Sequence, residues 1–474
     1  MAKTGGLADA VGALARALVD LGCEVTLVMP AYRTILENNS RLEETGMEVE
    51  VPVAGRSMRG VILRTWIGKK LPAFLIRADS YFLREGLYGN AKGDYADNAE
   101  RFTFFCKATL ELARRTAPWD VIHCNDWQTA LIPVLKKVHS QLYGEIQKTK
   151  VLFTIHNLAH HGNFPFSSWN LLDLDMQYFT PRYLEFYGNI NLLKGGMLFA
   201  DALTTVSKKY AGEIRTPEWG CGLDGVIRDR EKDLYGILNG VDYQEWNPET
   251  DPHIKKNYKA KNLIGKKICK KDLQEIYGLP VKASVPLIGM VSRLADQKGL
   301  DILIDAIEDL LHLDLQLVIL GAGDQRYQAL LDGLPGKYPE KIGVKIGFDN
   351  ALAHKIEAGA DIFLMPSKFE PCGLNQMYSL KYGTIPVVRA TGGLDDTIED
   401  YNPSSGSGNG FKFNGYSGAT LLEAVKRSIA VTYNRKAWRQ LMAKAMACDF
   451  SWGKSAKEYL ALYRKLAETP ILKR

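Results

Sequence analysis

Polar side chains stand directly after apolar runs at several places in this chain. In the first half, Asn125 and Asp126 end one run and His156 ends another. In the second half, Arg293 and Glu370 follow two further runs. Because open parallel sheets bind ligands outside the carboxyl ends of their strands, this placement predicts two such crevices that form one ligand-binding cleft.

Two cations five residues apart could hold a diphosphate. Arg293 and Lys298 lie on S-R-L-A-D-Q-K-G-L, which leaves a predicted strand and enters the next loop. A guanidinium and an ammonium so placed can bind a diphosphate and stabilise the charge that grows as it leaves. The alternative is a pair of solvated surface cations.

Two Thr-Gly-Gly-Leu strings give a second phosphate signal. Thr4–Leu7 precedes a helix predicted to begin near Asp9, and Thr391–Leu394 precedes one predicted to begin near Asp395. Glycine permits close approach of the backbone, and the amides at a helix N-terminus attract anions. For each string alone, a tight turn without a ligand is the commoner case.

Glu370 lies in a turn that Pro371 and Gly373 shape. Its carboxylate could hold sugar hydroxyls or act as an acid or base, and the alternative is a helix-capping acid. We expect Cys372 to be a small structural residue, because no histidine is placed to activate its thiol.

Several other sites are excluded. His156, His160 and His161 follow a strand and no carboxylate is spaced to join them, so we expect no metal. The run L-G-A-G-D-Q-R ends in Arg326 where a dinucleotide fingerprint requires glycine. The chain has no Walker A motif and no G-x-S-x-G. The seven cysteines stand singly, which is typical of reduced thiols in a cytosol-like compartment.

Short runs of valine, isoleucine and leucine must position these groups. They predict strands over 25–30, 74–79, 121–126, 150–157, 202–207, 235–240, 287–294, 315–323, 343–348, 361–367 and 385–391. Their lack of polar alternation indicates strands buried on both faces. Helical segments such as 9–22 and 351–360 supply the crossovers, so the pattern predicts two doubly wound α/β domains.

Length and charge agree with two domains that bind small ligands. The chain has 474 residues, more than one hydrophobic core usually serves, and a net charge of only +6. We therefore expect no nucleic acid as partner, and no apolar segment is long enough for a membrane span. The eight lysines within 255–271 indicate a solvated helical connection, with a polyanion patch as the alternative.

Taken together, the motifs resemble those of bacterial glycogen synthases and plant starch synthases. They are K-T-G-G-L-A-D (3–9), L-Y-G (87–89), H-C-N-D-W-Q (123–128), H-N-L-A (156–159), N-G-V-D (239–242), S-R-L-x-x-Q-K-G-L (292–300), S-K-F-E-P-C-G-L (367–374) and K-Y-G-T-I-P-V-V-R-x-T-G-G-L (381–394). They occur in the order of the family and cover nearly the whole chain.

The resemblance implies the GT-B fold, in which two Rossmann-like domains face a central cleft. It implies an acceptor-side domain over 1–242, a nucleotide-sugar domain over 243–455, and a last helix, 456–474, that packs back on the first domain. The implied reaction transfers glucose from ADP-glucose to the non-reducing end of an α-1,4-glucan with retention of configuration. No cofactor or metal is implied, and the partners are the nucleotide sugar and the glucan.

The resemblance also implies roles for individual residues. The catalytic group comprises Asp126, His156, Arg293, Lys298 and Glu370, in which the two cations bind the diphosphate, Glu370 holds the glucose, and the main chain of His156 lies near the anomeric carbon. The residues that bind substrate are Lys3, Gly5, Gly6, Asp9, Tyr88, Asn239, Phe348, Cys372, Gly373, Thr391, Gly392 and Gly393.

Three departures from the family pattern stand out. Family members place a strand ahead of K-T-G-G-L, whereas Met1 stands two residues before Lys3, so we expect an N-terminal domain without its first strand. A shortened sequence is the leading explanation. His160-His161 replace an aromatic residue and glutamine, and Asn125 replaces a histidine.

Two other functions stay open at this point. One is another retaining GT-B transferase, such as a sucrose synthase, and the other is an inactive glucan-binding scaffold. UDP-glucose is an alternative donor. We expect a cytoplasmic protein in a bacterium, or one in the plastid stroma of a plant.

Overall fold

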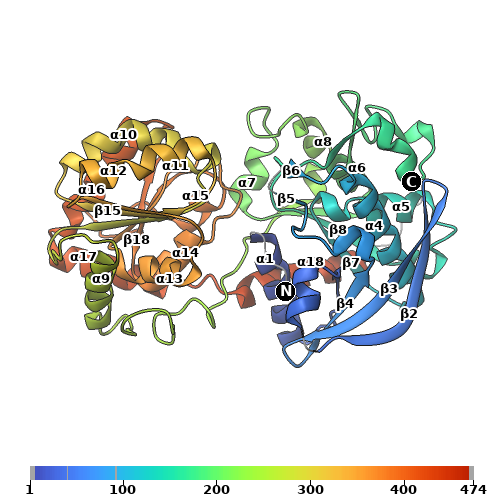
Figure 1. Ribbon diagram of the computed structural model, residues 1–474, viewed down its shortest axis with the longest axis horizontal. Coiled ribbons are helices and arrows are strands. Elements are labelled where there is room, and N and C mark those ends of the chain that lie inside the picture. The colour runs from blue at the N-terminus through green and yellow to red at the C-terminus, as the bar shows by residue number, and fades with distance from the viewer. Residues whose placement is uncertain (1–5, 40, 91–92, 469–474) are drawn as a thin grey trace. The chain divides into compact units, whose positions relative to one another are not determined.

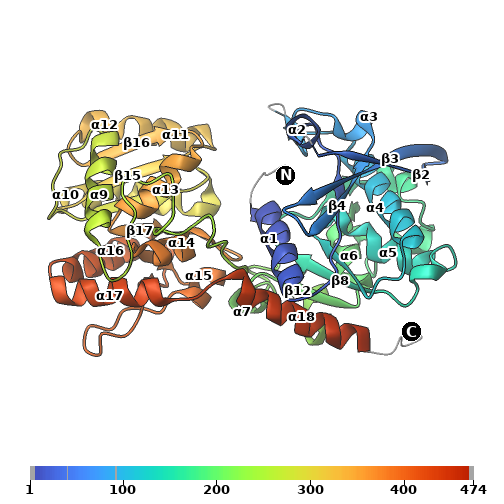
Figure 2. The same cartoon turned by 90° about the horizontal axis from the view of Figure 1, so that it is seen from below.

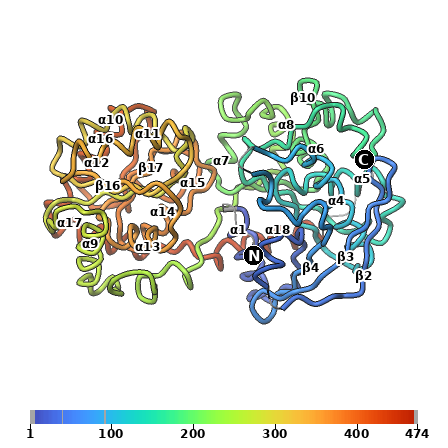
Figure 3. The backbone as a smooth tube through the Cα atoms, in the orientation of Figure 1, coloured from blue at the N-terminus to red at the C-terminus, as the bar shows by residue number. Residues whose placement is uncertain are grey.

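The computed structural model describes residues 6–39, 41–90 and 93–468, which divide into two compact units (Figure 1). The N-terminal unit takes the described parts of Met1–Val206, Ala211–Gly240 and Trp452–Arg474. The C-terminal unit takes Ser207–Tyr210 and Val241–Ser451. Figure 3 traces the chain, which returns to the N-terminal unit after Ser451.

The C-terminal unit is built on a six-stranded sheet in the order β16-β15-β14-β17-β18-β19. All its neighbouring strands are parallel. Counted along the chain, the order is third, second, first, fourth, fifth, sixth, which is the doubly wound arrangement. The strands are β14 (Leu287–Val291), β15 (Gln316–Gly321), β16 (Ile342–Ile346), β17 (Ile362–Met365), β18 (Ile385–Arg389) and β19 (Phe411–Phe413).

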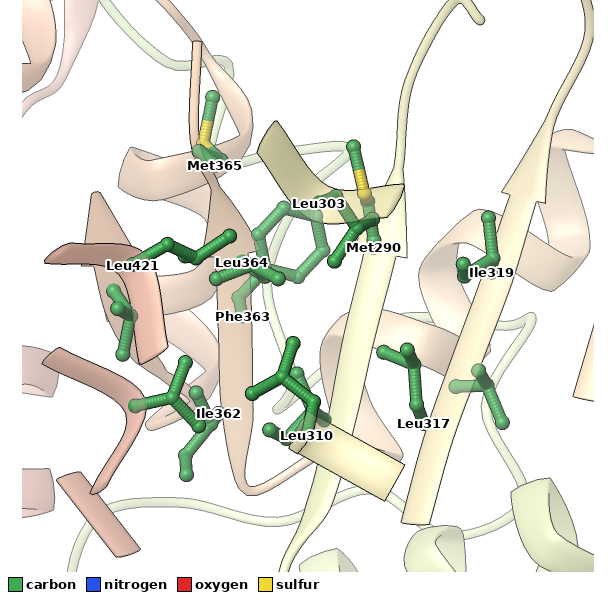
Figure 4. Packing of buried hydrophobic residues seen from close by; sticks show 14 of the residues in the cluster. Met290, Leu303, Leu310, Leu317, Ile319, Ile362, Phe363, Leu364, Met365 and Leu421 are labelled. Carbon is green, nitrogen blue, oxygen red and sulfur yellow. The ribbon is translucent and has the colours of Figure 1, made fainter. Parts of the chain in front are cut away.

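Crossover helices cover this sheet. Because parallel strands all start at the same end of a sheet, the chain must return to that end between one strand and the next. They include α10 (Leu300–His312), α11 (Gln325–Asp332), α13 (Asn350–Gly359), α14 (Asn375–Tyr382) and α15 (Gly392–Thr397). The same unit also contains α9 (Ile264–Ile276) ahead of β14, and α16 (Gly418–Thr432) and α17 (Arg435–Ala447) after β19. Figure 4 shows the core, where Phe363 of β17 and Met290 of β14 lie near Leu303 of α10. This core fixes the positions of the strands, and so of the loops that follow them.

The N-terminal unit contains two larger sheets. One is parallel and ordered β13-β12-β8-β7, and the other is ordered β1-β4-β3-β2. The strands are β1 (Leu27–Pro30), β2 (Glu43–Val53), β3 (Arg56–Ile67), β4 (Leu71–Arg77), β7 (Val121–Asn125), β8 (Lys150–Ile155), β12 (Ala202–Thr205) and β13 (Leu234–Gly236). Helices α4 (Asn98–Arg115), α5 (Leu131–Val138) and α6 (Leu192–Phe199) pack with them.

The long hairpin β2–β3 is not among the strands that the sequence predicts. Burial alternates along the second half of β2, so one face is solvated and the segment carries no continuous apolar run. The two strands meet at a two-residue turn in which Ala54 has φ 49° and Gly55 φ 73°. Such left-handed turns match the twist of an antiparallel hairpin.

Both predicted helix starts after the Gly-Gly pairs were wrong by a few residues. Helix α1 is Gly6–Asp20, so it already includes Gly6 and does not begin near Asp9. Helix α15 is Gly392–Thr397 and begins at the first glycine, not near Asp395. Gly392 and Gly393 both lie in the first turn of α15, and they serve packing there.

The last helix, α18 (Trp452–Glu468), belongs to the N-terminal unit (Figure 2). Tyr459 and Leu462 of α18 lie in one hydrophobic cluster with Leu14 of α1. Residues 469–474 of the predicted C-terminal helix lie outside the described residues. In the described part of the chain, every helix is too short or too polar to cross a lipid bilayer.

Candidate active site

In the C-terminal unit, Arg293 and Glu370 follow two strands that are far apart in sequence and adjacent in the sheet. Arg293 comes after β14 and Glu370 comes after β17, and these strands pair through Ile288 and Ile362. Between them the strand order reverses, and α/β sheets bind ligands at that point. The fold thus brings two of the predicted site residues to one place.

Lys298 and Glu370 form an ion pair here, with Nζ and Oε2 separated by 2.6 Å. The side chains are only 18% and 8% exposed. The Ser367 hydroxyl donates to the same Oε2 at 3.1 Å. The Lys298 ammonium can bind an anion, and the Glu370 carboxylate beside it can accept hydrogen bonds from hydroxyls.

Glycine allows the two loops to approach this closely. Gly299 follows Lys298 with φ 72°, and a Cβ on it would lie 2.0 Å from the carbonyl oxygen of Pro366. Any other residue would therefore push the Lys298 loop away from the segment that carries Ser367 and Glu370. The Q-K-G-L string is explained by this contact.

The Gly392-Gly393 pair packs against the same segment. A Cβ on Gly392 would lie 2.0 Å from the Glu370 carbonyl oxygen, and one on Gly393 would lie 2.0 Å from that of Cys372. The Gly393 amide donates to the Glu370 carbonyl at 3.1 Å. The pair thus holds the Glu370 turn in place. Its binding of a diphosphate stays a prediction.

The other predicted residues of this unit differ in how far they are exposed. Arg293 is exposed, and its Nη2 donates to Gln297 Oε1 at 3.0 Å. Cys372 is buried, while Gly373 takes φ 69°, which suits the turn. Phe348 follows β16 and is 92% exposed, so its ring is available to a planar ligand.

Thr391 is buried and stands directly ahead of α15. Ser367 is a residue that the sequence analysis missed. It lies three residues before Glu370, in S-K-F-E-P, and that spacing is the signal that could have revealed it. Its hydroxyl is fully buried against the carboxylate.

In the N-terminal unit, Asp126 and His156 meet at the carboxyl ends of β7 and β8. The His156 amide donates to Asp126 Oδ1 at 2.7 Å. His156 Nε2 lies 2.9 Å from Asn125 Oδ1. Asp126 has φ 55°, an unusual value for a residue other than glycine, and such values concentrate at functional sites.

Burial sets the charge of both groups. It raises the pKa of Asp126 to about 7, against the amides of His156 and Asn157, which lower it. It lowers the pKa of His156 to about 4, so this imidazole is neutral at pH 7. A neutral imidazole facing the Asn125 oxygen carries its proton on Nε2 and donates it. Burial thus brings the pKa of Asp126 close to neutral pH.

Tyr88 lies close enough to Asp126 to feel its charge. Burial first, and the Asp126 charge second, raise the pKa of the Tyr88 hydroxyl to about 12. The Tyr88 ring packs against Phe102 and Trp127, with centroid separations of 5.8 and 6.4 Å. This phenol stays protonated and can donate a hydrogen bond.

Of the remaining predicted residues, Asp9 lies on α1 and Asn239 is buried after β13. Gly6 is the first residue of α1, whereas Lys3 and Gly5 lie outside the described residues.

His123 does not join this group, although it lies in the same motif. Its Nδ1 lies 2.7 Å from the Tyr463 hydroxyl of α18, and its Nε2 lies 2.6 Å from Thr154 Oγ1. Burial lowers its pKa to about 3. His123 is a neutral core residue that ties α18 to the sheet.

Within the described ranges, no three His, Cys, Asp or Glu side chains gather as metal ligands. His161, which the sequence analysis weighed for such a site, packs edge-on against Phe186 at 5.4 Å.

Comparison with known families gives two matches that together span most of the chain. The model described as the starch synthase catalytic domain matches residues 1–229. The model described as glycosyl transferases group 1 matches residues 276–442.

Individual relatives agree with these matches. The glycogen synthase of Koribacter versatilis (strain Ellin345) is 46% identical over 98% of this chain and 95% of its own length. The glycogen synthase of Anaeromyxobacter sp. (strain Fw109-5) is 47% identical over 98% of this chain and 97% of its own length.

Two solved structures are similar to this chain. The catalytic domain of starch synthase IV from Arabidopsis thaliana, bound to ADP and acarbose, has a TM-score of 0.90 and 34% identity, and the match covers 99% of this chain and 97% of that one. Sucrose-phosphate synthase from Thermosynechococcus elongatus has a TM-score of 0.62 at 16% identity, over 98% of this chain and 94% of that one, which is a likeness of fold alone.

Proposed function

Because this chain belongs to the glycogen and starch synthase family and is therefore a glycosyltransferase, we propose that it transfers glucose from ADP-glucose to the non-reducing end of an α-1,4-glucan, with retention of configuration. The observation that carries the proposal is the shielded pair of Lys298 and Glu370, which follow the same two neighbouring strands, β14 and β17, as the site residues of this unit. The chain is similar to a starch synthase whose structure holds ADP and acarbose. This similarity supports adenine as the base of the donor and an α-glucan as the acceptor.

In this proposal the C-terminal unit binds the donor. Arg293 and Lys298 neutralise the diphosphate and stabilise the negative charge that develops as it leaves. Glu370 accepts hydrogen bonds from glucose hydroxyls, and Ser367 fixes its carboxylate. When the diphosphate takes the Lys298 ammonium, Glu370 is released from its ion pair and becomes available to the sugar. Phe348 offers its exposed ring to the base. Further contacts to the substrate come from Cys372 and Gly373 in the Glu370 turn and from Thr391, Gly392 and Gly393 at the start of α15.

The N-terminal unit contributes polar groups to the sugar. Asp126 accepts a hydrogen bond from a sugar hydroxyl. The main chain of His156 stabilises the positive charge that develops at the anomeric carbon. Tyr88 and Asn239 are further donors to the substrate, the motif residues Lys3, Gly5 and Gly6 bind it as well, and the Asp9 carboxylate accepts a hydrogen bond from it. The hydrogen bond from the His156 amide to Asp126 holds the two groups in register.

We propose that the reaction needs no metal or other cofactor, because Arg293 and Lys298 supply the charge that a metal ion gives other transferases. The prediction is tested by dialysing the enzyme against EDTA and measuring the rate with and without added Mg²⁺. Equal rates are expected. A rate that falls with EDTA and returns with Mg²⁺ contradicts this part.

The direct test of the proposed function supplies labelled ADP-glucose and glycogen and measures label in the precipitated polymer. Incorporation is expected, and it should be nearly absent in Lys298→Ala and Glu370→Ala. Lys337→Ala is the matched control, because Lys337 forms an ion pair with Glu308 in which both side chains are about 60% exposed. UDP-glucose in a parallel reaction identifies the preferred base. Glucan binding without incorporation would show a scaffold.

A further inference from the structure

Gln297 lies between the two cations that the proposed reaction uses. It is the middle residue of the short 3₁₀ turn η6 (Asp296–Lys298), four residues after Arg293 and directly before Lys298. Its side chain is half-buried. The close contact of Gly299 explains the glycine of the Q-K-G-L string, but it does not explain the glutamine.

Three hydrogen bonds converge on Gln297. Its Oε1 accepts from Arg293 Nη2 at 3.0 Å. Its Nε2 donates to the Phe369 carbonyl at 3.4 Å, and its own carbonyl accepts from the Lys368 amide at 2.9 Å. Gln297 therefore joins the guanidinium that follows β14 to the segment that leads into Glu370.

The Phe369 contact decides which end of the Gln297 amide faces Arg293. The amide has donors only on its nitrogen and acceptors only on its oxygen. Because the nitrogen faces the Phe369 carbonyl, the oxygen is left for the guanidinium. The amide thus presents a fixed acceptor, and it holds the guanidinium in one place relative to the Glu370 turn.

The acceptor that holds Arg293 carries no charge. A carboxylate in this position would offset part of the guanidinium charge, which the proposed reaction needs for the diphosphate. Asp296, the neighbouring carboxylate, has other partners, because it lies 2.6 Å from Arg326 Nη2 and also accepts from the Tyr327 hydroxyl. The neutral amide of Gln297 therefore limits the motion of the guanidinium without offsetting its charge.

Arg293 needs such a partner because its side chain is exposed. A long side chain in water samples many rotamers, and a ligand that binds it must first immobilise it. For one side chain this lowers affinity by about two- to tenfold. A hydrogen bond that restricts the side chain before the ligand arrives removes much of that loss.

We propose that Gln297 is a positioning residue for the donor diphosphate. It acts through Arg293, whose guanidinium it holds in the conformation that binds the anion, and it leaves the charge of that guanidinium to the anion. This inference rests on the proposed function, because it gives Gln297 a part in binding the same donor.

The test is a double-mutant cycle on the full chain. Wild type, Gln297→Ala, Arg293→Ala and the double variant are compared in the Kd of ADP and in kcat/KM for ADP-glucose with glycogen. If Gln297 acts through Arg293, the effect of Gln297→Ala depends on whether Arg293 is present. Gln440→Ala, which removes an exposed glutamine from α17, is the matched control.

We expect Gln297→Ala to weaken ADP binding by about three- to tenfold when Arg293 is present, and by less than about twofold when Arg293 is alanine. Gln440→Ala should change neither quantity. An equal effect of Gln297→Ala in both backgrounds would overturn the proposal, because Gln297 would then act only by packing the turn. The absence of any effect when Arg293 is present would overturn it too.

Gln297→Glu separates orientation from charge. Glutamate keeps an acceptor for Arg293, but it adds a negative charge beside the diphosphate and loses the donor to Phe369. We therefore expect it to weaken ADP binding by about tenfold or more, and further than Gln297→Ala does. Binding as tight as that of Gln297→Ala would overturn the proposal, because a neutral acceptor is then not required.

The wild type tests the proposed function in the same experiment. If it neither binds ADP nor labels glycogen, the proposed function fails and the inference fails with it. If it does both and the effects of Gln297 and Arg293 are independent, only the role of Gln297 fails.

Discussion

Replacing Lys298 by alanine tests both the chemistry of the candidate site and its stability. The change removes an ammonium that lies 2.6 Å from Glu370 Oε2 and leaves Ser367 as the partner of that oxygen. If Lys298 stabilises the leaving diphosphate, its loss should lower kcat/KM for ADP-glucose about 10²–10³-fold, or ~2.7–4 kcal/mol of transition-state stabilisation.

The same change also exposes a stability cost. Glu370 is 8% exposed, so removal of its partner leaves a shielded charge uncompensated. Breaking a buried pair in this way costs about 3–5 kcal/mol, and the 18% exposure of Lys298 places the expected value at the lower end. The double variant Lys298→Ala/Glu370→Gln removes the charge, so it should regain much of that stability without regaining activity.

The assay combines urea unfolding with initial rates of polymer labelling, measured where each variant is more than nine-tenths folded. Lys337→Ala should match the wild type in both measurements, because its ion pair with Glu308 is exposed. The reasoning is refuted if the double variant recovers activity along with stability, or if Lys298→Ala keeps its rate once folding is controlled.

Three further predictions concern packing and pH. Gly393→Ala should destabilise the protein by at least about 1–3 kcal/mol and lower activity, because its Cβ would lie 2.0 Å from the Cys372 carbonyl oxygen, whereas Gly333→Ala, which has open space around it, should change unfolding by less than about 1 kcal/mol. Asp126→Asn should gain stability relative to wild type as pH rises from about 4 to 7 in urea titrations, because the raised pKa of Asp126 makes its ionisation unfavourable to the folded state over that range; a constant difference would contradict this. His123→Gln should be less stable than wild type at pH 7, and the gap should narrow as pH falls from 6.5 towards 4, because burial lowers the pKa of His123 to about 3 while the unfolded chain takes up the proton; a gap that widens on acidification would refute the assignment.

Much of the fold could be predicted because parallel strands buried on both faces carry continuous apolar runs. The runs at 315–323 and 385–391 contain β15 and β18 for this reason. The β2–β3 hairpin was missed because a half-solvated strand has no such run. The start of α15 was displaced because the Gly-Gly pair suggested a loop, whereas both glycines are part of the helix and its packing.

The site was predictable only residue by residue. That Arg293 and Glu370 follow strands can be derived from the sequence, but that β14 and β17 are neighbours depends on the sheet order. The partnership of Ser367 with Glu370 depends on the turn between them. His123 belongs to the same H-C-N-D-W-Q motif as Asp126, yet its ring packs against Tyr459 of α18, from the far end of the chain.

The most direct test of the proposed function is the fate of the sugar itself. The enzyme is supplied with ¹³C-glucose-labelled ADP-glucose and glycogen, and the washed polymer is digested with an α-1,4-specific amylase. Labelled maltose should appear, with the label in the α configuration. An unlabelled polymer, or label transferred to fructose or released as free glucose, would contradict the proposed reaction.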